Sequence, residues 1–389
     1  MMRRSVRVLC TSTGGAGHVG ALAPIAQALR ERGHEVQWAV APDGGDVVGR
    51  MGFDWFAAGL TTGARRVIAA AALGDIMQLP MSERRGPLFA AFFARAAGPV
   101  MRRELTPIVD RVRPDVIVRE TAELAAAPMA AARGIPLVTV AFSGVLPERA
   151  RGEVLEELRP LWEAEGLGEP TWADVYGQRY LHPFPVSFGQ RPDSPVVRPA
   201  RRARGVPSPT PASWMSTLGT ERPFVYVTSG TEPPSAMFPW REVLAALGEM
   251  DLDAVATVGP HVDPASVAPA PVNVRVERFV PQADLLGRAT AVLSHGGAGT
   301  VLGAAAYGLP QVVVPLFADQ WENGVAVTDA GCGLVMQPDA RRVDDFDQAV
   351  RSVLSTPSLR DAASRVEREI DAMPTVSELA VEIESLAGG

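Results

Sequence analysis

Short apolar runs alternate with helix-length segments along most of the chain. Strand-like runs rich in β-branched residues occupy residues 6–12, 35–40, 115–120 and 136–142 of the first half, and 223–230, 253–259, 273–280, 291–297 and 311–317 of the second. The segment 22–33 is typical of those between them, because it has helix length and ends at Gly33, a residue favoured at helix C-termini. This alternation predicts parallel sheets covered by helices on both faces, the α/β class.

The composition changes between the two halves. Residues 190–222 hold many prolines and arginines without an apolar period, which indicates a linker or an extended crossing segment. The expected boundaries are therefore an N-terminal domain at 1–205, a linker at 206–222, a C-terminal domain at 223–370, and a C-terminal helix at 371–389 that could return to the N-terminal domain.

Bulk properties narrow the class of protein. With 389 residues, of which 47% are hydrophobic, the chain suits two domains with their own cores. Its net charge of −7 and the lack of a basic stripe argue against a nucleic-acid partner.

Cys10 and Cys332 lie far apart and are expected as free thiols in a reducing cytosol. The N-terminus is interpreted as a first strand rather than a signal peptide, and no apolar run is long enough for a membrane span. A cytoplasmic protein is therefore expected.

Residues 15–20 have the G-x-G-x-x-G spacing of a dinucleotide-binding loop, between a predicted strand and a predicted helix. This context leaves open an oxidoreductase that binds NAD. Such a site also uses an acidic residue at the end of the second strand, and Asp43 is a weak match because it follows a proline. The loop contains His18, and a side chain that titrates near neutrality is suited to general base catalysis.

Residues 294–300 form a second glycine loop that opens a second predicted helix. Unpaired first-turn amides and the helix dipole favour an anion such as a diphosphate there. Glycines let the backbone approach the ligand, and Thr300 and His295 can donate hydrogen bonds. The turn Ser229-Gly230-Thr231, after the first strand of the second half, is a further candidate to face the phosphates, with a simple ST-turn as the alternative.

Residues 279–324, together with Gly17-His18, resemble the donor-binding signature of glycosyltransferase family one, and in particular its actinobacterial natural-product (antibiotic) subgroup. The resemblance implies the GT-B fold, in which two Rossmann-like doubly wound parallel-sheet domains face each other across a cleft. It also implies an inverting enzyme, in which an acceptor hydroxyl displaces a nucleotide diphosphate from the anomeric carbon while a base takes the hydroxyl proton.

The resemblance assigns roles to residues of both halves. It implies that His18 is the base and that Glu120, where the family usually has aspartate, holds the other imidazole nitrogen; Glu123 is the alternative acid. In the second half the expected contacts are from Phe279, Val280 and Gln282 to the nucleobase, from Ser229, Thr231, His295, Gly296, Gly297, Gly299 and Thr300 to the diphosphate, and from Asp319 and Gln320 to the donor sugar.

The acceptor pocket is expected in the first domain. Residues 60–105 interrupt the alternation and are too long for a simple crossover, so they are candidates to cover a substrate. Met77, Phe89 and Phe93 in this segment suit an apolar aglycone, although they could equally belong to the core.

No metal site is expected. The Asp-x-Asp triplets at 251–253 and 345–347 do not follow the carboxyl end of a strand, and we interpret them as solvated acids. Helix amides and His295 would neutralise the leaving group instead. The nucleotide sugar is a co-substrate, and no cofactor is expected.

The resemblance also favours a thymidine diphosphate (TDP) sugar. Plant relatives that use uridine donors carry a glutamate eight residues beyond the signature histidine, where this chain has Gly303. The predicted function is transfer of a (deoxy)sugar from a TDP-sugar to a hydroxyl of an apolar natural product. A GT-B nucleotide-sugar epimerase and a non-catalytic sugar-nucleotide-binding activator of a partner enzyme remain as alternatives, and a homodimer is left open.

Overall fold

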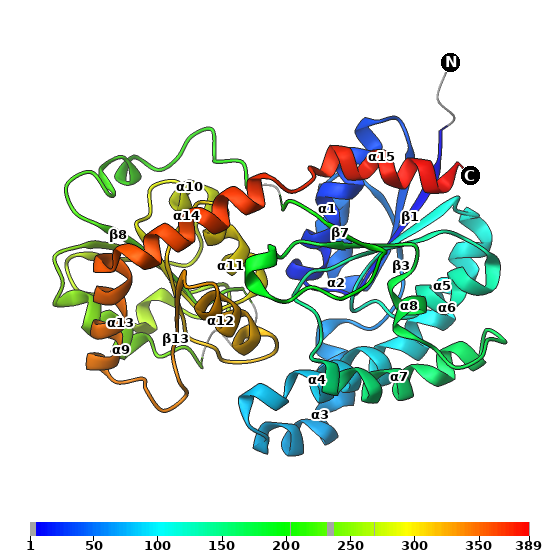
Figure 1. The fold of residues 1–389 in the computed structure, drawn as a ribbon, viewed down its shortest axis with the longest axis horizontal. Coiled ribbons are helices and arrows are strands. Elements are labelled where there is room, and N and C mark those ends of the chain that lie inside the picture. Colours follow the sequence, from blue (N-terminus) through cyan, green and yellow to red (C-terminus); the bar gives the residue numbers. More distant parts are fainter. Residues whose placement is uncertain (1–4, 203, 232–236, 268, 389) are drawn as a thin grey trace. The chain divides into compact units, whose positions relative to one another are not determined.

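The computed structural model describes residues 5–202, 204–231, 237–267 and 269–388 and divides the chain into two compact units (Figure 1). The first unit comprises Met1–Pro183, Pro192–Arg201 and Pro374–Gly389, and the second comprises Phe184–Arg191 and Arg202–Met373. Each unit contains one parallel sheet with helices packed on it. The predicted α/β class with two doubly wound sheets is confirmed.

The first unit has a seven-stranded sheet in the order β3-β2-β1-β4-β5-β6-β7. Its strands are β1 (Arg7–Ser12), β2 (Glu35–Val40), β3 (Asp54–Ala57), β4 (Val116–Glu120), β5 (Leu137–Val140), β6 (Arg179–His182) and β7 (Val197–Pro199). All neighbouring strands pair in parallel. The order reverses direction between β1 and β4, and such a switch point is where open α/β sheets bind ligands.

Helices cover both faces of this sheet. They are α1 (Ala16–Glu31), α2 (Pro42–Arg50), α3 (Thr62–Gln78), α4 (Arg85–Phe89), α5 (Gly98–Val112), α6 (Ala126–Arg133), α7 (Glu148–Glu163), α8 (Trp172–Tyr176) and α15 (Val376–Ala387). Short 3₁₀ helices occupy η1 (Met81–Glu83) and η3 (Val186–Phe188), the latter in the second unit, and a π-helix occupies η2 (Ala90–Ala97). Because strand side chains alternate, Val8 and Cys10 pack with α1 and α15, while Leu9 packs with α5, α6 and α7.

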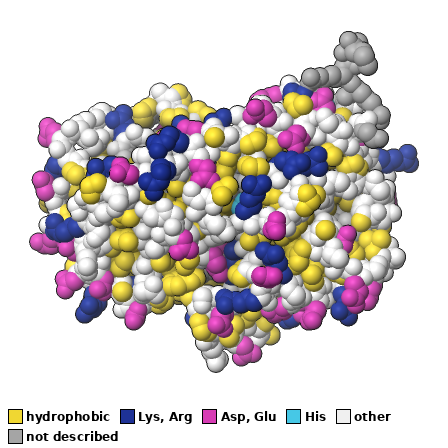
Figure 2. All heavy atoms as spheres, in the orientation of Figure 1, with side chains coloured by type: hydrophobic (Ala, Val, Ile, Leu, Met, Phe, Trp, Pro, Cys, Tyr) yellow, Lys and Arg dark blue, Asp and Glu magenta, His cyan; other side chains and the backbone are white. Residues whose placement is uncertain are grey.

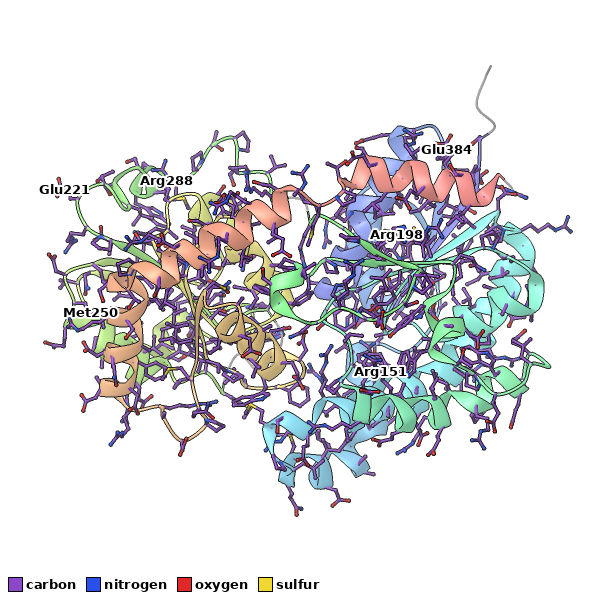
Figure 3. All side chains as sticks on the ribbon, in the orientation of Figure 1. Arg151, Arg198, Glu221, Met250, Arg288 and Glu384 are labelled. Atoms are coloured by element: carbon purple, nitrogen blue, oxygen red, sulfur yellow. The ribbon has the colours of Figure 1, made fainter. Side chains whose placement is uncertain are left out.

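The C-terminal helix α15 belongs to the first unit and packs against α1, and the two lie side by side in Figure 1. Its Leu379 and Ile383 join the core cluster of α1. Glu384, labelled in Figure 3, accepts hydrogen bonds from the Arg32 guanidinium at the end of α1 and lies 3.8 Å from the imidazole of His34. Apolar packing and an ion pair therefore both attach the end of the chain to the first unit.

The second unit has a six-stranded parallel sheet in the order β10-β9-β8-β11-β12-β13. Its elements are β8 (Phe224–Thr228), α9 (Trp240–Gly248), β9 (Asp253–Thr257), β10 (Val274–Glu277), α10 (Gln282–Leu286), β11 (Ala291–Ser294), α11 (Ala298–Ala305), β12 (Gln311–Val313), α12 (Gln320–Asp329), β13 (Gly333–Val335), α13 (Val343–Ser355) and α14 (Pro357–Asp371), with 3₁₀ turns η4 (Ser213–Thr217) and η6 (Pro264–Val267). Helices α9 and α13 share one core cluster, whereas α10, α11, α12 and α14 contribute to two others. The switch point lies between β8 and β11.

The structure adds detail that the apolar pattern did not reveal. The short strands β3, β6, β7 and β13 lie at or near the sheet edges and were not predicted. Strand β7 lies within the proline-rich stretch 190–222. The rest of that stretch belongs largely to the second unit, where η4 packs Met215 against the core.

The visible surface mixes charges of both signs. Figure 2 shows Arg side chains interspersed with Asp and Glu side chains over the face drawn. Within the part of the chain that the structure describes, no helix is both long and apolar enough to cross a membrane.

Candidate active site

The loop after β1 carries His18 into the first turn of α1. Gly15 caps the helix with a φ of 109°, a left-handed conformation that favours glycine. A Cβ at Gly17 would meet no atom within 4 Å, so this glycine is not required by packing. The loop thus resembles a phosphate-binding loop in sequence, but the side chain that it presents is an imidazole.

His18 and Glu120 meet at the switch point of the first sheet. Glu120 is the last residue of β4, the strand beside β1, and its side chain is fully buried. His18 Nδ1 lies 3.2 Å from Glu120 Oε1, although the N–H direction is not aligned as in an ideal hydrogen bond. Because Nδ1 faces the carboxylate, Nε2 is the nitrogen left to exchange a proton with a substrate.

Three donors of the protein fix the Glu120 carboxylate. Oε1 accepts hydrogen bonds from the backbone N–H (3.1 Å) and the hydroxyl (2.9 Å) of Thr13, and Oε2 accepts one from the Ala122 N–H (2.6 Å). Burial by itself raises the pKa of Glu120, but the His18 imidazole and these N–H donors outweigh it and hold the pKa below its usual value. The carboxylate is therefore charged and rigidly held beside the imidazole.

Glu123, the alternative acid, binds donors on β1 and at the start of α6 rather than His18. Its carboxylate accepts hydrogen bonds from the Thr11 hydroxyl (2.6 Å) and from the N–H groups of Ala125 and Ala126, at the start of α6. Burial raises its pKa above the usual value. The structure thus brings Glu120, and not Glu123, to His18.

Two aromatic rings lie close to the His18 ring. The ring centroids of Phe142 and Phe93 lie 4.4 and 5.5 Å from that of His18. Phe142 also lines a narrow cavity of the first unit. The other residues that line it are Arg85, Phe89, Thr121, Ser143, Gly144, Val145, Leu146, Arg151, Trp172, Tyr176 and Tyr180, and Arg151 is labelled in Figure 3. A largely apolar cavity with five aromatic residues in its wall therefore adjoins the imidazole.

The three predicted acceptor residues have different positions. Phe89 lines the cavity, and Phe93 on the π-helix η2 lies between Phe89 and the His18 ring. Met77, near the end of α3, is half-buried and does not line this cavity. The predicted segment 60–105 thus supplies part of the cavity wall, and the segments 142–146 and 172–180 supply most of the rest.

In the second unit, His295 follows β11 and its ring fits between two glycines. A Cβ at Gly230 would lie 2.5 Å from His295 Cε1, and one at Gly297 would lie 2.5 Å from Nε2. Either substitution would displace the ring. Burial lowers the pKa of His295 to about 4, against the opposing effects of Asp319 and the Thr228 carbonyl. The imidazole is therefore neutral at pH 7 and can still donate one N–H.

The loops around His295 place their hydroxyls differently. Thr300, in the first turn of α11, accepts a hydrogen bond from Gln282 Nε2 at 2.9 Å, so its own hydroxyl proton is left for a ligand. The Ser229 hydroxyl donates to the Val258 carbonyl at 3.0 Å, which uses the proton that a phosphate oxygen would need. Thr231 is exposed. In this turn the Thr231 hydroxyl, rather than that of Ser229, is free to face a phosphate.

The three residues predicted to contact the nucleobase have different environments. Phe279 is 65% exposed, so its ring is available for stacking. Val280 packs its side chain in the core with Leu285 and Leu286, so any contact with a base would have to come from its backbone. Gln282 is half-buried and faces α11.

Asp319 and Gln320 lie where α12 begins. Asp319 is the N-cap residue of that helix. Gln320 Oε1 accepts hydrogen bonds from the N–H groups of Leu316 and Phe317, which leaves its NH₂ group as the available donor. The residue before the pair, Ala318, has a φ of 55°, an uncommon conformation for a residue with a Cβ.

The Asp-x-Asp triplets form ion pairs with arginines on the surface. Asp253 pairs with Arg222, and Asp345 and Asp347 pair with Arg342 and Arg351 on and beside α13. Among the residues that the structure describes, no three His, Cys, Asp or Glu side chains are grouped so that they could hold a metal ion.

Comparison with known proteins places this geometry in a family. Residues 241–386 match the model of the erythromycin biosynthesis protein CIII-like C-terminal domain. The chain is 31% identical to the elloramycin glycosyltransferase ElmGT of Streptomyces olivaceus over 98% of both chains. The chain belongs to the actinobacterial natural-product glycosyltransferases of GT-B fold.

Two further relatives agree with this assignment. The TDP-daunosamine transferase DnrS of Streptomyces peucetius is 28% identical over 98% of this chain and 97% of its own. The crystal structure of the glycosyltransferase SnogD from Streptomyces nogalater matches 99% of this chain and 100% of its own with a TM-score of 0.77 and 26% identity. These relatives confirm the prediction that the chain is an enzyme of the transferase class.

Sequence reasoning missed residues that support the site of this glycosyltransferase. Asn323 is fully buried, and its Nδ2 donates to the Gly296 carbonyl at 2.9 Å and to Asp319 Oδ2 at 3.0 Å. It thereby connects the glycine loop after β11 to the start of α12. The signal was available, because Asn323 is one helical turn after Asp319. Phe142 was visible only as the end of a predicted strand, and nothing in the sequence placed it against His18.

Proposed function

We propose that this glycosyltransferase moves a sugar from a nucleoside diphosphate to a hydroxyl of an apolar natural product, with inversion at the anomeric carbon. The observation that carries the proposal is the contact between His18 and the charged, buried Glu120 beside an aromatic cavity. An imidazole held by a carboxylate at one nitrogen has the arrangement of a general base.

In the proposed reaction the acceptor hydroxyl attacks the anomeric carbon while His18 Nε2 takes its proton. The new bond joins the acceptor oxygen to that carbon, and the bond from the carbon to the diphosphate breaks with its electron pair on the phosphate oxygen. Glu120 stabilises the imidazolium that forms and keeps Nδ1 protonated. The aromatic rings around His18 would exclude water, which would otherwise compete as the acceptor.

The second unit is proposed to bind the donor. The first-turn N–H groups of α11, the Thr300 hydroxyl and the neutral His295 can all donate to the diphosphate, and they would stabilise the charge that develops as it leaves. Asp319 and the free NH₂ group of Gln320 offer acceptors and donors for sugar hydroxyls. Donors already in place would let the reaction proceed without a divalent cation.

The donor is proposed to be a TDP-sugar, with deoxysugars in the accepted class. Gly303 offers no carboxylate, and a Cβ there would lie 3.3 Å from Leu286 Cδ1 and 3.4 Å from Gln282 Oε1, so a side chain would press on both neighbours. A ribose 2′-hydroxyl would therefore lack a partner from this position. The name of the relative DnrS, a TDP-daunosamine transferase, supports the same donor class. We expect a preference of roughly 10- to 100-fold in kcat/KM for thymidine over uridine donors.

The deciding experiment compares TDP-glucose and UDP-glucose with a panel of aromatic and macrolide aglycones, scored by mass spectrometry with and without EDTA. A glycosylated product whose anomeric configuration, measured by NMR, is opposite to that of the donor would support the proposal. Retention of configuration, or activity lost with EDTA and restored by Mg²⁺ or Mn²⁺, would contradict its mechanism.

Equal kcat/KM values for the two donors would contradict the role of Gly303. Epimerised donor without acceptor would favour the epimerase, and nucleotide binding without turnover would favour the activator.

A further inference from the structure

Arg202, the first residue of the longer segment of the second unit, has no anionic partner among the residues that the structure describes. Among the described residues, no side chain or carbonyl forms a hydrogen bond or an ion pair with its guanidinium. Arg204, two residues later, is paired: its guanidinium donates to the Ala306 carbonyl, to Glu367 and to Asp371. The two arginines share one short stretch of chain, but only Arg204 has an internal partner.

Partial burial makes the unpaired charge of Arg202 energetically unfavourable. The residue is half-buried, and burial is the one cause that lowers the pKa of its guanidinium from the usual value. Arginine keeps its charge at neutral pH even so. A partly desolvated charge without a counter-charge is unfavourable unless a ligand supplies one. The energetics therefore favour an anion at this place.

The guanidinium lies against the first turn of α11. A Cβ at Gly299 would lie 3.4 Å from Arg202 Nη2 and 3.8 Å from both Cζ and Nη1. Gly299 is the second residue of the eight-residue helix, where backbone N–H groups have no carbonyl partner within the helix. The buried Nδ1 of His295, four residues earlier in the chain, also lacks a hydrogen-bond partner. Several donors thus gather around the start of α11.

The same face of α11 links this place to the predicted nucleoside residues. Gly299 and Gly303 are four residues apart, so they lie one above the other, about 6 Å apart along the helix axis. Gly303 is beside Gln282 and Leu286, whereas Gly299 is beside Arg202. A nucleotide whose nucleoside lies near Gly303 would therefore reach the guanidinium with its phosphates.

We propose that Arg202 binds the diphosphate of the nucleotide donor. This inference rests on the proposed function. A guanidinium can hold two phosphate oxygens at once through parallel N–H donors. It would hold the diphosphate in the bound donor and stabilise the negative charge that the β-phosphate oxygen gains when its bond to the anomeric carbon breaks. Arg202 donates hydrogen bonds in this step, and no proton leaves it.

The test compares Arg202→Met, Arg202→Lys and the matched control Arg204→Met with the wild-type chain. Calorimetry would measure the Kd values of thymidine, TMP and TDP at two salt concentrations. Loss of a charge-assisted phosphate contact should weaken TDP binding by about 10- to 100-fold in Arg202→Met and reduce its salt dependence. Thymidine binding should not change. Arg202→Lys should recover part of the affinity, and Arg204→Met should bind like wild type.

Two results would overturn the proposal for Arg202. One is unchanged TDP affinity in Arg202→Met; the other is an equal loss for thymidine and TDP, which would mean that Arg202 only supports the nucleoside side or the local fold. Thermal unfolding of each variant identifies a folding defect, and Arg202→Lys keeps the test valid if Arg202→Met is unstable. Failure of the wild-type chain to bind any nucleoside diphosphate would instead overturn the proposed function, and with it this inference.

Discussion

The switch points of the two sheets share a topology but create different chemical environments for their histidines. In each sheet a glycine-rich loop follows a central strand and opens a helix, α1 in the first unit and α11 in the second. In the first, the neighbouring strand ends in a buried carboxylate 3.2 Å from His18. In the second, the neighbouring strand is followed by Ser229-Gly230-Thr231, and the His295 ring lies between glycines.

The difference shows that the residues packed around each glycine loop, and not the loop motif alone, determine what the histidine can do. A carboxylate at Nδ1 stabilises an imidazolium and therefore suits His18 to accept a proton. Burial with little opposing charge keeps His295 neutral, since its pKa is lowered to about 4. That suits it to donate a hydrogen bond to an anion without changing its own charge.

The largest expected effect comes from removing the His18 imidazole, which tests the contrast between the two histidines. His18→Ala should lower kcat by about 10²- to 10⁴-fold, because a general base contributes that much, while the Kd for TDP stays unchanged. Steady-state kinetics and calorimetry on the same preparation separate the two effects. A variant that keeps more than about a tenth of wild-type turnover would show that His18 is not the base.

A smaller effect is expected when the carboxylate alone is removed. Glu120→Gln keeps the shape of the side chain and the base itself, so kcat should fall on the order of 10- to 100-fold, less than for His18→Ala. The double variant should be no worse than His18→Ala, because Glu120 acts through the imidazole. An unchanged rate in Glu120→Gln, or additive losses, would contradict the pairing.

The glycines of the two loops should respond differently to the same substitution. Gly297→Ala places a Cβ 2.5 Å from His295 Nε2, so the ring must move and TDP binding should weaken by roughly 10-fold. Gly17→Ala meets no atom within 4 Å and adds a better helix former in the first turn of α1, so TDP binding and the melting temperature should not fall. Equal losses in nucleotide affinity would remove the distinction between the loops.

The smallest effect concerns acid stability. Because the pKa of His295 is lowered in the folded chain, the folded state disfavours protonation, and this contribution to stability is complete above about pH 6.5 and is lost as the pH falls toward 4. His295→Gln cannot protonate, so its free energy of unfolding should fall less between pH 7 and 5, by an amount on the order of 1–2 kcal/mol. Urea denaturation at both pH values measures this. Identical pH dependence in the two proteins would mean that His295 is not desolvated.

The apolar alternation was enough to predict the central strands of both sheets, since these strands are buried on both faces and give continuous apolar runs. The edge strands are short and partly exposed, so β3, β7 and β13 lacked such a run. Side-chain directions were equally out of reach. The sequence could not show that Val280 faces the core or that the Ser229 hydroxyl is used by the Val258 carbonyl.

Local sequence by itself determined the two glycine loops, the helices that they open and the presence of a histidine in each, because these depend on neighbours a few residues apart. Only the tertiary structure decided which side chains those histidines meet. Glu120 is about 100 residues from His18 and reaches it because β4 pairs with β1, and Arg202 reaches Gly299 because the chain returns to α11. Contacts of this kind depend on strand order and packing, which no short stretch of sequence encodes.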